Sequence, residues 1–269
     1  MIDNLLISFS GGRTSAFMTK YILENVNYDK YNKIIVFMNT GKEREETYKF
    51  INDCDQNWNF KTVWIEPVIF ESGKNTFKIV DYKTADRTGK AFEDMIKRYG
   101  IPNVSFPHCT RELKLNPVRK YMLSIGIKDY LTAMGIRADE PHRLSPKKNI
   151  IYPLASDMVM TSTLIRSFWE KQSFDLQLKD YEGNCDLCWK KSKRKKMTLI
   201  KNNNKISDWW SSMEKKYSKG NYNFHRNNES TQDLINESKK PFDKYSDVWD
   251  KIKFQEVMDF EMDCFCKTT

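Results

Sequence analysis

The stretch Ser10-Gly11-Gly12-Arg13-Thr14-Ser15 follows an apolar run at residues 5–9 and precedes a helix-like segment at residues 16–23. Paired glycines let the backbone approach a ligand without a Cβ clash, and a helix start directs free N–H groups and a positive dipole end at an anion. Three hydroxyl side chains in the stretch add donors. A strand, a glycine turn and a helix start therefore predict a phosphate site. The alternative is a tight turn in which a serine or threonine caps the helix.

The composition is typical of a soluble chain with anionic partners. The 269 residues carry a net charge of +9, with 39% hydrophobic and 30% charged residues. This length predicts one α/β domain with an extension, or two small domains, and the positive charge favours partners from nucleotides to nucleic acid. No apolar run is long enough to cross a bilayer, and the first residues lack the basic region of a signal peptide. We therefore expect a cytoplasmic protein with no membrane partner.

Apolar runs that alternate with helical patterns predict the fold class. Residues 33–38 form a continuous apolar run followed by turn residues, which is typical of a strand buried on both faces of a parallel sheet. We expect an α/β fold with an open, mainly parallel sheet flanked by helices, and an irregular insertion after Pro67. Further strands are expected at residues 61–66, ended by Pro67, at 129–134 and at 149–154, and helices at 45–51, 91–99, 108–124 and 161–169.

The composition changes after residue 190. Six of the seven residues from Lys190 to Lys196 are basic, and amphipathic segments follow to the end. We predict a nucleotide-binding α/β domain at residues 1–190 and a basic, mainly helical C-terminal extension at residues 191–269. The basic run is either a solvated face or a contact for nucleic acid. Four aromatic residues of the extension either pack in a core or stack on bases: Trp209, Trp210, Tyr217 and Tyr222.

Two further loops follow predicted strands, and ligands bind at the carboxyl ends of strands in open α/β sheets. Asn39-Thr40-Gly41 follows the strand at residues 33–38, and Gly135, Arg137 and Arg143 follow the strand at 129–134. Arginines clamp phosphate or sulfate in a bidentate manner, which lysine does less well. The alternatives are a strand-to-helix turn capped by threonine and a solvated loop that pairs with its own carboxylates.

Six cysteines in a cytosolic chain suit ligands or catalysts better than disulfides. Cys185 and Cys188 form a C-x-x-C, whereas Cys264 and Cys266 form a C-x-C. Cys109 stands near the start of a predicted helix, whose N-terminus lowers the pKa of a thiol and favours the thiolate as nucleophile or ligand. The C-x-x-C spacing suits zinc, which needs four ligands, or an iron–sulfur cluster.

Taken in order, these motifs resemble those of the phosphoadenosine phosphosulfate (PAPS) reductase family and of the related PP-loop ATP pyrophosphatases. Residues 10–15 resemble the PP-loop, Asn39-Thr40-Gly41 followed by Glu46-Thr47 resembles the second nucleotide loop, and residues 135–143 resemble the arginine loop. The segment from Cys109 to Pro117 is similar to C-x-x-x-K-x-x-P, with one extra residue before the lysine. The resemblance implies an adenine nucleotide alpha hydrolase-like fold and a site for ATP or PAPS that includes Lys114 and the three loops.

The same resemblance implies a [4Fe–4S] cluster. Cluster-bearing members have a tandem Cys-Cys where this chain has His108-Cys109. The fourth ligand is then His108, Cys264 or Cys266, or one iron stays open, and zinc held by three cysteines and His108 is the alternative. Cys264 resembles the catalytic cysteine of the reductase tail, and Cys109 is the other candidate nucleophile. Three cysteines match cluster ligands: Cys109, Cys185 and Cys188.

Three functions are consistent with these motifs. A PAPS-reductase-like enzyme would bind the nucleotide at the PP-loop and attack its sulfur with a thiolate, and a thioredoxin-like reductant would clear the product. An ATP pyrophosphatase would bind ATP with Mg²⁺, adenylate a nucleic acid and thiolate it with sulfur from a donor, as in tRNA thiolation or DNA phosphorothioation. A non-catalytic nucleotide-binding module would use its metal site for structure alone.

Overall fold

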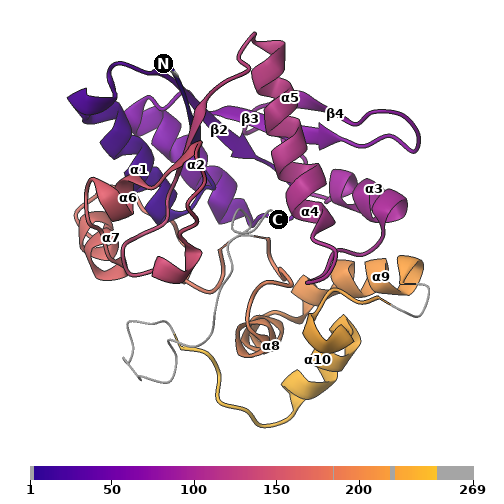
Figure 1. Cartoon of the computed structure of the whole chain (residues 1–269). Coiled ribbons are helices and arrows are strands. Elements are labelled where there is room, and N and C mark those ends of the chain that lie inside the picture. The colour runs from indigo at the N-terminus through magenta and orange to yellow at the C-terminus, as the bar shows by residue number, and fades with distance from the viewer. Residues whose placement is uncertain (1–2, 184, 219–221, 247–269) are drawn as a thin grey trace.

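The computed structural model describes residues 3–183, 185–218 and 222–246 (Figure 1). At its centre is a six-stranded sheet of order β4-β3-β2-β1-β5-β6, in which β3 and β4 pair antiparallel and the other neighbours pair parallel. The expected α/β class, with an open and mainly parallel sheet, is confirmed. The strands are β1 (Asn4–Ser8), β2 (Asn32–Met38), β3 (Val63–Val68), β4 (Thr76–Val80), β5 (Leu131–Met134) and β6 (Ile150–Ile151).

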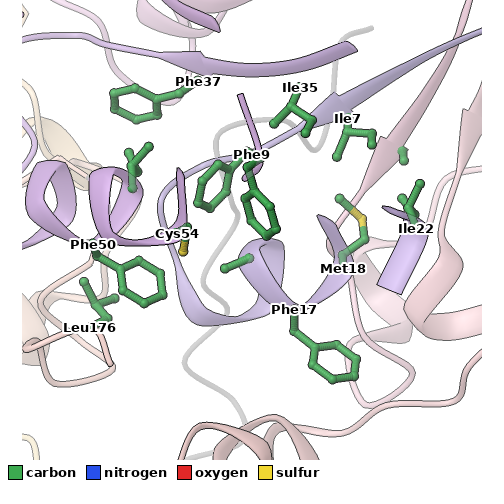
Figure 2. Packing of buried hydrophobic residues seen from close by; sticks show 14 of the residues in the cluster. Ile7, Phe9, Phe17, Met18, Ile22, Ile35, Phe37, Phe50, Cys54 and Leu176 are labelled. Carbon is green, nitrogen blue, oxygen red and sulfur yellow. The ribbon is translucent and has the colours of Figure 1, made fainter. Parts of the chain in front are cut away.

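Helices cover both faces of the sheet. Ile7 and Ile35, which are register partners on β1 and β2, pack in one core with α1 (Arg13–Glu24) and α2 (Glu45–Trp58), as Figure 2 shows. Their neighbours Leu6 and Val36 face the other way and pack against α5 (Asn116–Ser124). Because successive strand residues point to opposite faces, a strand covered on both sides is apolar throughout.

The remaining helices lie around this layered core. In Figure 1, α6 and α7 lie beside α1, whereas α8, α9 and α10 gather on the side of α3 and α4. These helices are α3 (Lys90–Tyr99), α4 (His108–Thr110), α6 (Pro153–Ser156), α7 (Ser162–Trp169), α8 (Lys193–Asn202), α9 (Asp208–Tyr217) and α10 (Thr231–Lys239). Shorter turns are η1 (Val26–Tyr28), the π turn η2 (Arg111–Leu115), η3 (Pro141–Arg143), η4 (Asn204–Ser207) and η5 (Arg226–Asn228).

The C-terminal helices share a second core with α3. Phe92 of α3, Trp210 of α9 and Leu234 of α10 belong to one buried cluster. Cys109 and Cys188 lie in the same cluster. The division of the chain at residue 190 stays a prediction, and the described residues on both sides of it contribute to this one core.

Three expectations about the strands are wrong. Pro67 does not end β3, because it lies past Ile65, the last residue paired with β2, and its missing N–H therefore interrupts no bond on that side. The insertion after it holds a second strand, β4, which pairs with β3 as an antiparallel hairpin arm. The strand expected at residues 149–154 is only two residues long, since α6 begins at Pro153, whose fixed φ suits the first turn of a helix.

The basic run at residues 190–196 is not the solvated face that a charge run usually forms. Four of its six basic side chains are buried, and Lys193 pairs with Glu229 and Glu237. Trp209, Trp210 and Tyr217 pack in or against the second core, whereas Tyr222 is 53% exposed. No helix among the described residues has the length and apolar character needed to cross a membrane.

Candidate functional site

The loop at residues 10–15 can adopt its shape only because Gly11 has no side chain. Gly11 has a φ of +77°, and a Cβ there would lie 2.6 Å from Thr47 Cγ2 and 2.8 Å from Ile51 Cδ1. Both neighbours are buried on α2, so neither can move aside easily. The loop thereby packs directly on α2, with Gly12 as the N-cap of α1. This is the strand, glycine turn and helix start expected of a phosphate loop.

Ser15 holds the loop together from inside. Its Oγ accepts hydrogen bonds from the backbone N–H groups of Ser10, at 3.2 Å, and Gly12, at 3.3 Å. The same hydroxyl donates to the carbonyl of Gly12 at 2.9 Å and lies 3.0 Å from Ser10 Oγ. A buried hydroxyl with this many local partners fixes the backbone before any ligand arrives.

Arg13 points away from the loop, although the sequence placed it among the nucleotide-binding residues. Its guanidinium forms a two-point ion pair with Asp175, at 2.7 and 2.8 Å. It also donates to the carbonyl groups of Leu176 and Leu178. In this geometry Arg13 ties the start of α1 to residues 175–178.

The arginine loop lies directly on the PP-loop. A Cβ at Gly135 would be 3.1 Å from the Cα of Ser15, so the small residue permits this approach. Arg137 Nη1 donates to Thr14 Oγ1 at 3.2 Å, and its Nε donates to Asp139 at 2.9 Å. Burial raises the pKa of Asp139, but the Ser162 amide and the Arg137 guanidinium outweigh it and lower that pKa. Arg137 therefore faces an ionised partner beside the PP-loop.

Arg143 lies behind Arg137 and is buried. Glu140 accepts a hydrogen bond from Arg143 and lies 3.5 Å from Arg137 Nη2. One carboxylate thus links the two predicted phosphate arginines. An anion that approached Arg137 would compete with Asp139 and Glu140 for the same guanidinium.

The second loop, Asn39-Thr40-Gly41, is buried at the carboxyl end of β2. Asn39 donates to Glu66 at 2.6 Å and accepts from the hydroxyl of Tyr48 at 2.8 Å. Gly41 has a φ of +74°, and a Cβ there would meet the backbone of Gly89 at 2.8 Å. Since β1, β2 and β5 are parallel, all three loops emerge at one edge of the sheet.

Glu43 connects this loop to the cysteines, and no motif in the sequence singled it out. Its carboxylate accepts from the Thr40 amide at 3.0 Å and the Thr40 hydroxyl at 2.7 Å. The thiol of Cys185 donates to it at 3.8 Å and also lies 3.4 Å from Thr40 Oγ1. The place of Glu43 in the loop after β2 could have indicated a site residue. Acidic residues are, however, also common just before a helix, where they stabilise its N-terminus.

Cys109, Cys185 and Cys188 are all buried and belong to the second core. Thr110 follows Cys109 and Trp189 follows Cys188. The side chains of both residues hold a buried donor that has no hydrogen-bond acceptor within the described ranges. Among residues 3–183, 185–218 and 222–246, however, no three His, Cys, Asp or Glu side chains form a group able to hold a metal ion. The metal-ligand role of these three cysteines therefore stays a prediction.

The cysteines at positions 264 and 266 lie outside the described residues. The candidate nucleophile Cys264 is therefore not placed by this structure, and neither is the tail's share of a metal site.

The extra residue between Cys109 and Lys114 is absorbed as a π turn. The helical segment from His108 to Ser124 passes through η2, in which Arg111 to Leu115 are wound more widely. A π turn takes up one inserted residue without breaking the helix, and such turns are frequent at functional sites. Lys114 lies within the turn and is buried.

His108 faces aromatic rings. It stacks on Phe106 with ring centroids 5.9 Å apart, lies 5.9 Å from Tyr99, and has its Nδ1 3.4 Å from Arg111 Nη2. Burial and the Arg111 charge lower the pKa of His108, so its imidazole is neutral at pH 7. The role of His108 as a metal ligand stays a prediction.

A third set of contacts joins the loop after β2 to the C-x-x-C loop and to α9. Lys42 pairs with Asp186 at 3.1 Å and lies 4.8 Å from the ring centre of Trp209. Trp210 Nε1 donates to the same Asp186 at 2.7 Å. The loop after β2, the C-x-x-C loop and α9 therefore meet at one carboxylate.

Comparisons with known proteins identify a family and two uncharacterised relatives. Residues 4–152 match the family described as phosphoadenosine phosphosulfate reductase domain. An uncharacterised nin region protein, ORF290 of Escherichia phage lambda, is 39% identical over 71% of this chain and 67% of its own length. An uncharacterised protein of Methanocaldococcus jannaschii is 27% identical over 54% of this chain but only 25% of its own length.

A comparison with solved structures finds the phosphoadenylyl-sulfate (PAPS) reductase of Candida auris in its phosphate complex, with a TM-score of 0.40 and 14% identity over 62% of this chain and 72% of that one. Because the family match covers more than half of the residues, the chain belongs to the phosphoadenosine phosphosulfate reductase domain family.

Proposed function

We propose that this protein is an enzyme that binds an adenine nucleotide at the PP-loop and performs sulfur chemistry with a neighbouring cysteine. The observation that carries the proposal is the contact between Thr40 Oγ1 and Cys185 Sγ at 3.4 Å, which joins the nucleotide edge to the cysteine core. Arg137, held against Thr14 at 3.2 Å, supplies a cation beside the phosphate loop. A thiol and a phosphate cradle at one sheet edge are the two parts that such chemistry needs.

The favoured substrate is PAPS. The PP-loop amides and Arg137 would bind the phosphosulfate end, where negative charge gathers as the nucleotide departs. A cysteine thiolate, Cys264 or Cys109, would attack sulfur, so that an S–S bond forms while the S–O bond to the nucleotide breaks. Adenosine bisphosphate leaves with the bonding pair. A thioredoxin-like dithiol then supplies two electrons, which release sulfite and return the thiol.

A second function has one observation in its favour. His108 stands where cluster-bearing reductases have the first of two cysteines, and its ring packs on Phe106 and Tyr99. This departure favours an ATP pyrophosphatase that, with Mg²⁺, adenylates a nucleic acid and replaces oxygen with sulfur from a donor. The same three loops would then hold ATP, and pyrophosphate would be the leaving group.

Product analysis separates the two functions. The full chain is incubated with PAPS and a dithiol reductant, and separately with ATP and Mg²⁺. Sulfite and adenosine bisphosphate from the first mixture, with no pyrophosphate from the second, are the expected products. Pyrophosphate from ATP with PAPS unchanged would refute the favoured function, and no turnover in either mixture would favour the non-catalytic binding module.

A pair of cysteine variants provides the internal control. Cys109→Ser removes a thiol of the second core, whereas Cys54→Ser removes a fully buried thiol of the first core, packed around α1 and α2. We expect loss of turnover in the first variant and unchanged turnover in the second. Equal activity of the two variants would exclude Cys109 from the chemistry and leave Cys264 as the nucleophile to test.

A further inference from the structure

Four aromatic side chains form a continuous surface at the junction of α3, the start of α4 and the segment after α9. We call it the aromatic face: Tyr99, Phe106, His108 and Tyr222. His108 stacks on Phe106 at an interplanar angle of 12°, and Phe106 meets Tyr222 edge-on at a centroid distance of 5.6 Å. Phe106 is 45% exposed and Tyr222 is 53% exposed. Large aromatic rings left in water beside one another indicate a surface that another molecule covers.

The loop that presents this face is held in a fixed shape. Asn103 is buried, and its side-chain oxygen accepts from the backbone amides of Ser105 and Phe106, both at 3.0 Å. The Asn103 amide donates to the carbonyl of Phe106 at 3.1 Å, and the His108 amide donates to that carbonyl at 2.8 Å. Phe106 is therefore exposed by a built turn, and its ring is ready for contact without reordering of the backbone.

Two arginines lie beside the Tyr99 ring of the aromatic face. The guanidinium of Arg98 lies 5.0 Å from the ring centre of Tyr99, and that of Arg111 lies 5.8 Å from it. Arg98 donates to the carbonyls of Phe70 and Gly73, which are neutral acceptors that leave its charge in place. Arg111 pairs with Glu112 but keeps 55% of its side chain exposed. Exposed rings with cations beside them match the bases and phosphates of a single strand.

We propose that the aromatic face binds unpaired bases of single-stranded nucleic acid, with phosphates directed toward Arg98 and Arg111. Base stacking requires ring faces that a duplex keeps covered, so a single strand fits and a duplex does not. The buried basic run at residues 190–196 offers no comparable surface, because four of its lysines are inside the protein. His108 leads directly into Cys109, so the bound strand would lie close to the second core. The proposal does not depend on which nucleotide the PP-loop uses.

Fluorescence anisotropy with labelled twelve-nucleotide DNA and RNA strands tests the proposal on the full chain. We expect saturable binding that weakens as salt rises, with at least about tenfold loss of affinity in the double variant Phe106→Ala, Tyr222→Ala. The single variant Phe106→Trp should bind the strands with wild-type affinity because it keeps a ring that can stack on a base. The control, Leu164→Ala, changes a 48% exposed residue on α7 and should bind as the wild type does.

Other outcomes would overturn the proposal. Unchanged affinity in the double variant would place any nucleic acid elsewhere, and equal competition by a duplex would refute base stacking. Sensitivity of anionic vesicle binding to the same variant, without oligonucleotide binding, would assign the face to a membrane surface instead. Nucleotide binding at the PP-loop, measured by calorimetry with ATP and PAPS, should be the same in every variant, which separates this proposal from the proposed function.

Discussion

Replacement of Gly11 by alanine is the most direct test of the PP-loop geometry. At a φ of +77° an alanine carries backbone strain, and its Cβ would lie 2.6 Å from Thr47 Cγ2 and 2.8 Å from Ile51 Cδ1. Left-handed strain costs about 1–2 kcal/mol, and overpacking of a well-filled core costs about 1–3 kcal/mol. We therefore expect a loss of about 2–5 kcal/mol in the free energy of unfolding, which lowers Tm by roughly 7–14 °C at the middle of that range.

Gly12→Ala provides a control one residue away. Gly12 has a φ of −100°, and a Cβ there would meet only Ser10 Oγ, at an ordinary 3.7 Å. Alanine is a poorer N-cap than glycine, so a loss below about 1 kcal/mol is expected. Urea unfolding followed by circular dichroism measures both variants, and calorimetry measures their affinity for ATP and PAPS.

The comparison also bears on binding. If Gly11→Ala shifts the loop off α2, nucleotide affinity should fall together with stability. The reasoning is refuted if the two variants unfold at the same urea concentration, because the clash and the strain would then be absent.

Three further predictions follow from the same contacts. Arg137→Lys should weaken the binding of ATP or PAPS about tenfold or more in calorimetry, since a lysine loses the planar fork, and unchanged affinity would remove Arg137 from the site. Among the described residues, no three His, Cys, Asp or Glu side chains form a group that could hold a metal ion. Any iron or zinc found after anaerobic purification should therefore depend on the tail cysteines and be lost when Cys264 and Cys266 are both changed to serine. Metal retained by that double variant would contradict this prediction. Burial and the Lys196 ammonium hold the pKa of His225 well below its ordinary value of 6.5. As pH drops below about 6.5, His225 therefore binds a proton in the unfolded chain but not in the folded chain, and the free energy of unfolding falls. Between pH 6.5 and 5.5 the wild type should lose up to about 1 kcal/mol more than His225→Gln in urea unfolding, and parallel pH profiles would count against this reasoning.

Buried lysines make the C-terminal region unusual. Burial lowers the pKa of Lys196 to about 8, even though the nearby Cys188 raises it, and its ammonium lies 3.2 Å from His225 Nδ1. Composition alone places a lysine-rich run at the surface. Here the run leads into α8, whose inner face packs into the second core. The aliphatic part and the charged end of its buried lysine side chains are therefore both shielded from solvent.

Much of the fold could be read from local sequence. The apolar runs that became β1, β2 and β5 lie where strands were expected, and the helices at residues 90–99 and 162–169 lie where helical periods were expected. The short β6 and the hairpin arm β4 could not be read, because two residues carry no period and β4 is half exposed. The prediction that Pro67 ends the strand was wrong for a related reason. A proline ends strand pairing only where a neighbouring strand would accept a hydrogen bond from the backbone N–H that proline lacks, and the pairing with β2 ends before Pro67.

The sequence alone determined the three loops and their order, because glycines and arginines directly after apolar strands are local features that parallel strands bring to one edge. Tertiary structure decided which of those side chains meet. Arg137 reaches Thr14 across 123 positions and Cys185 reaches Thr40 across 145, whereas Arg13 turns away to Asp175. Such pairs depend on how helices pack over the sheet, and packing places a side chain according to shape and burial, which no local pattern contains.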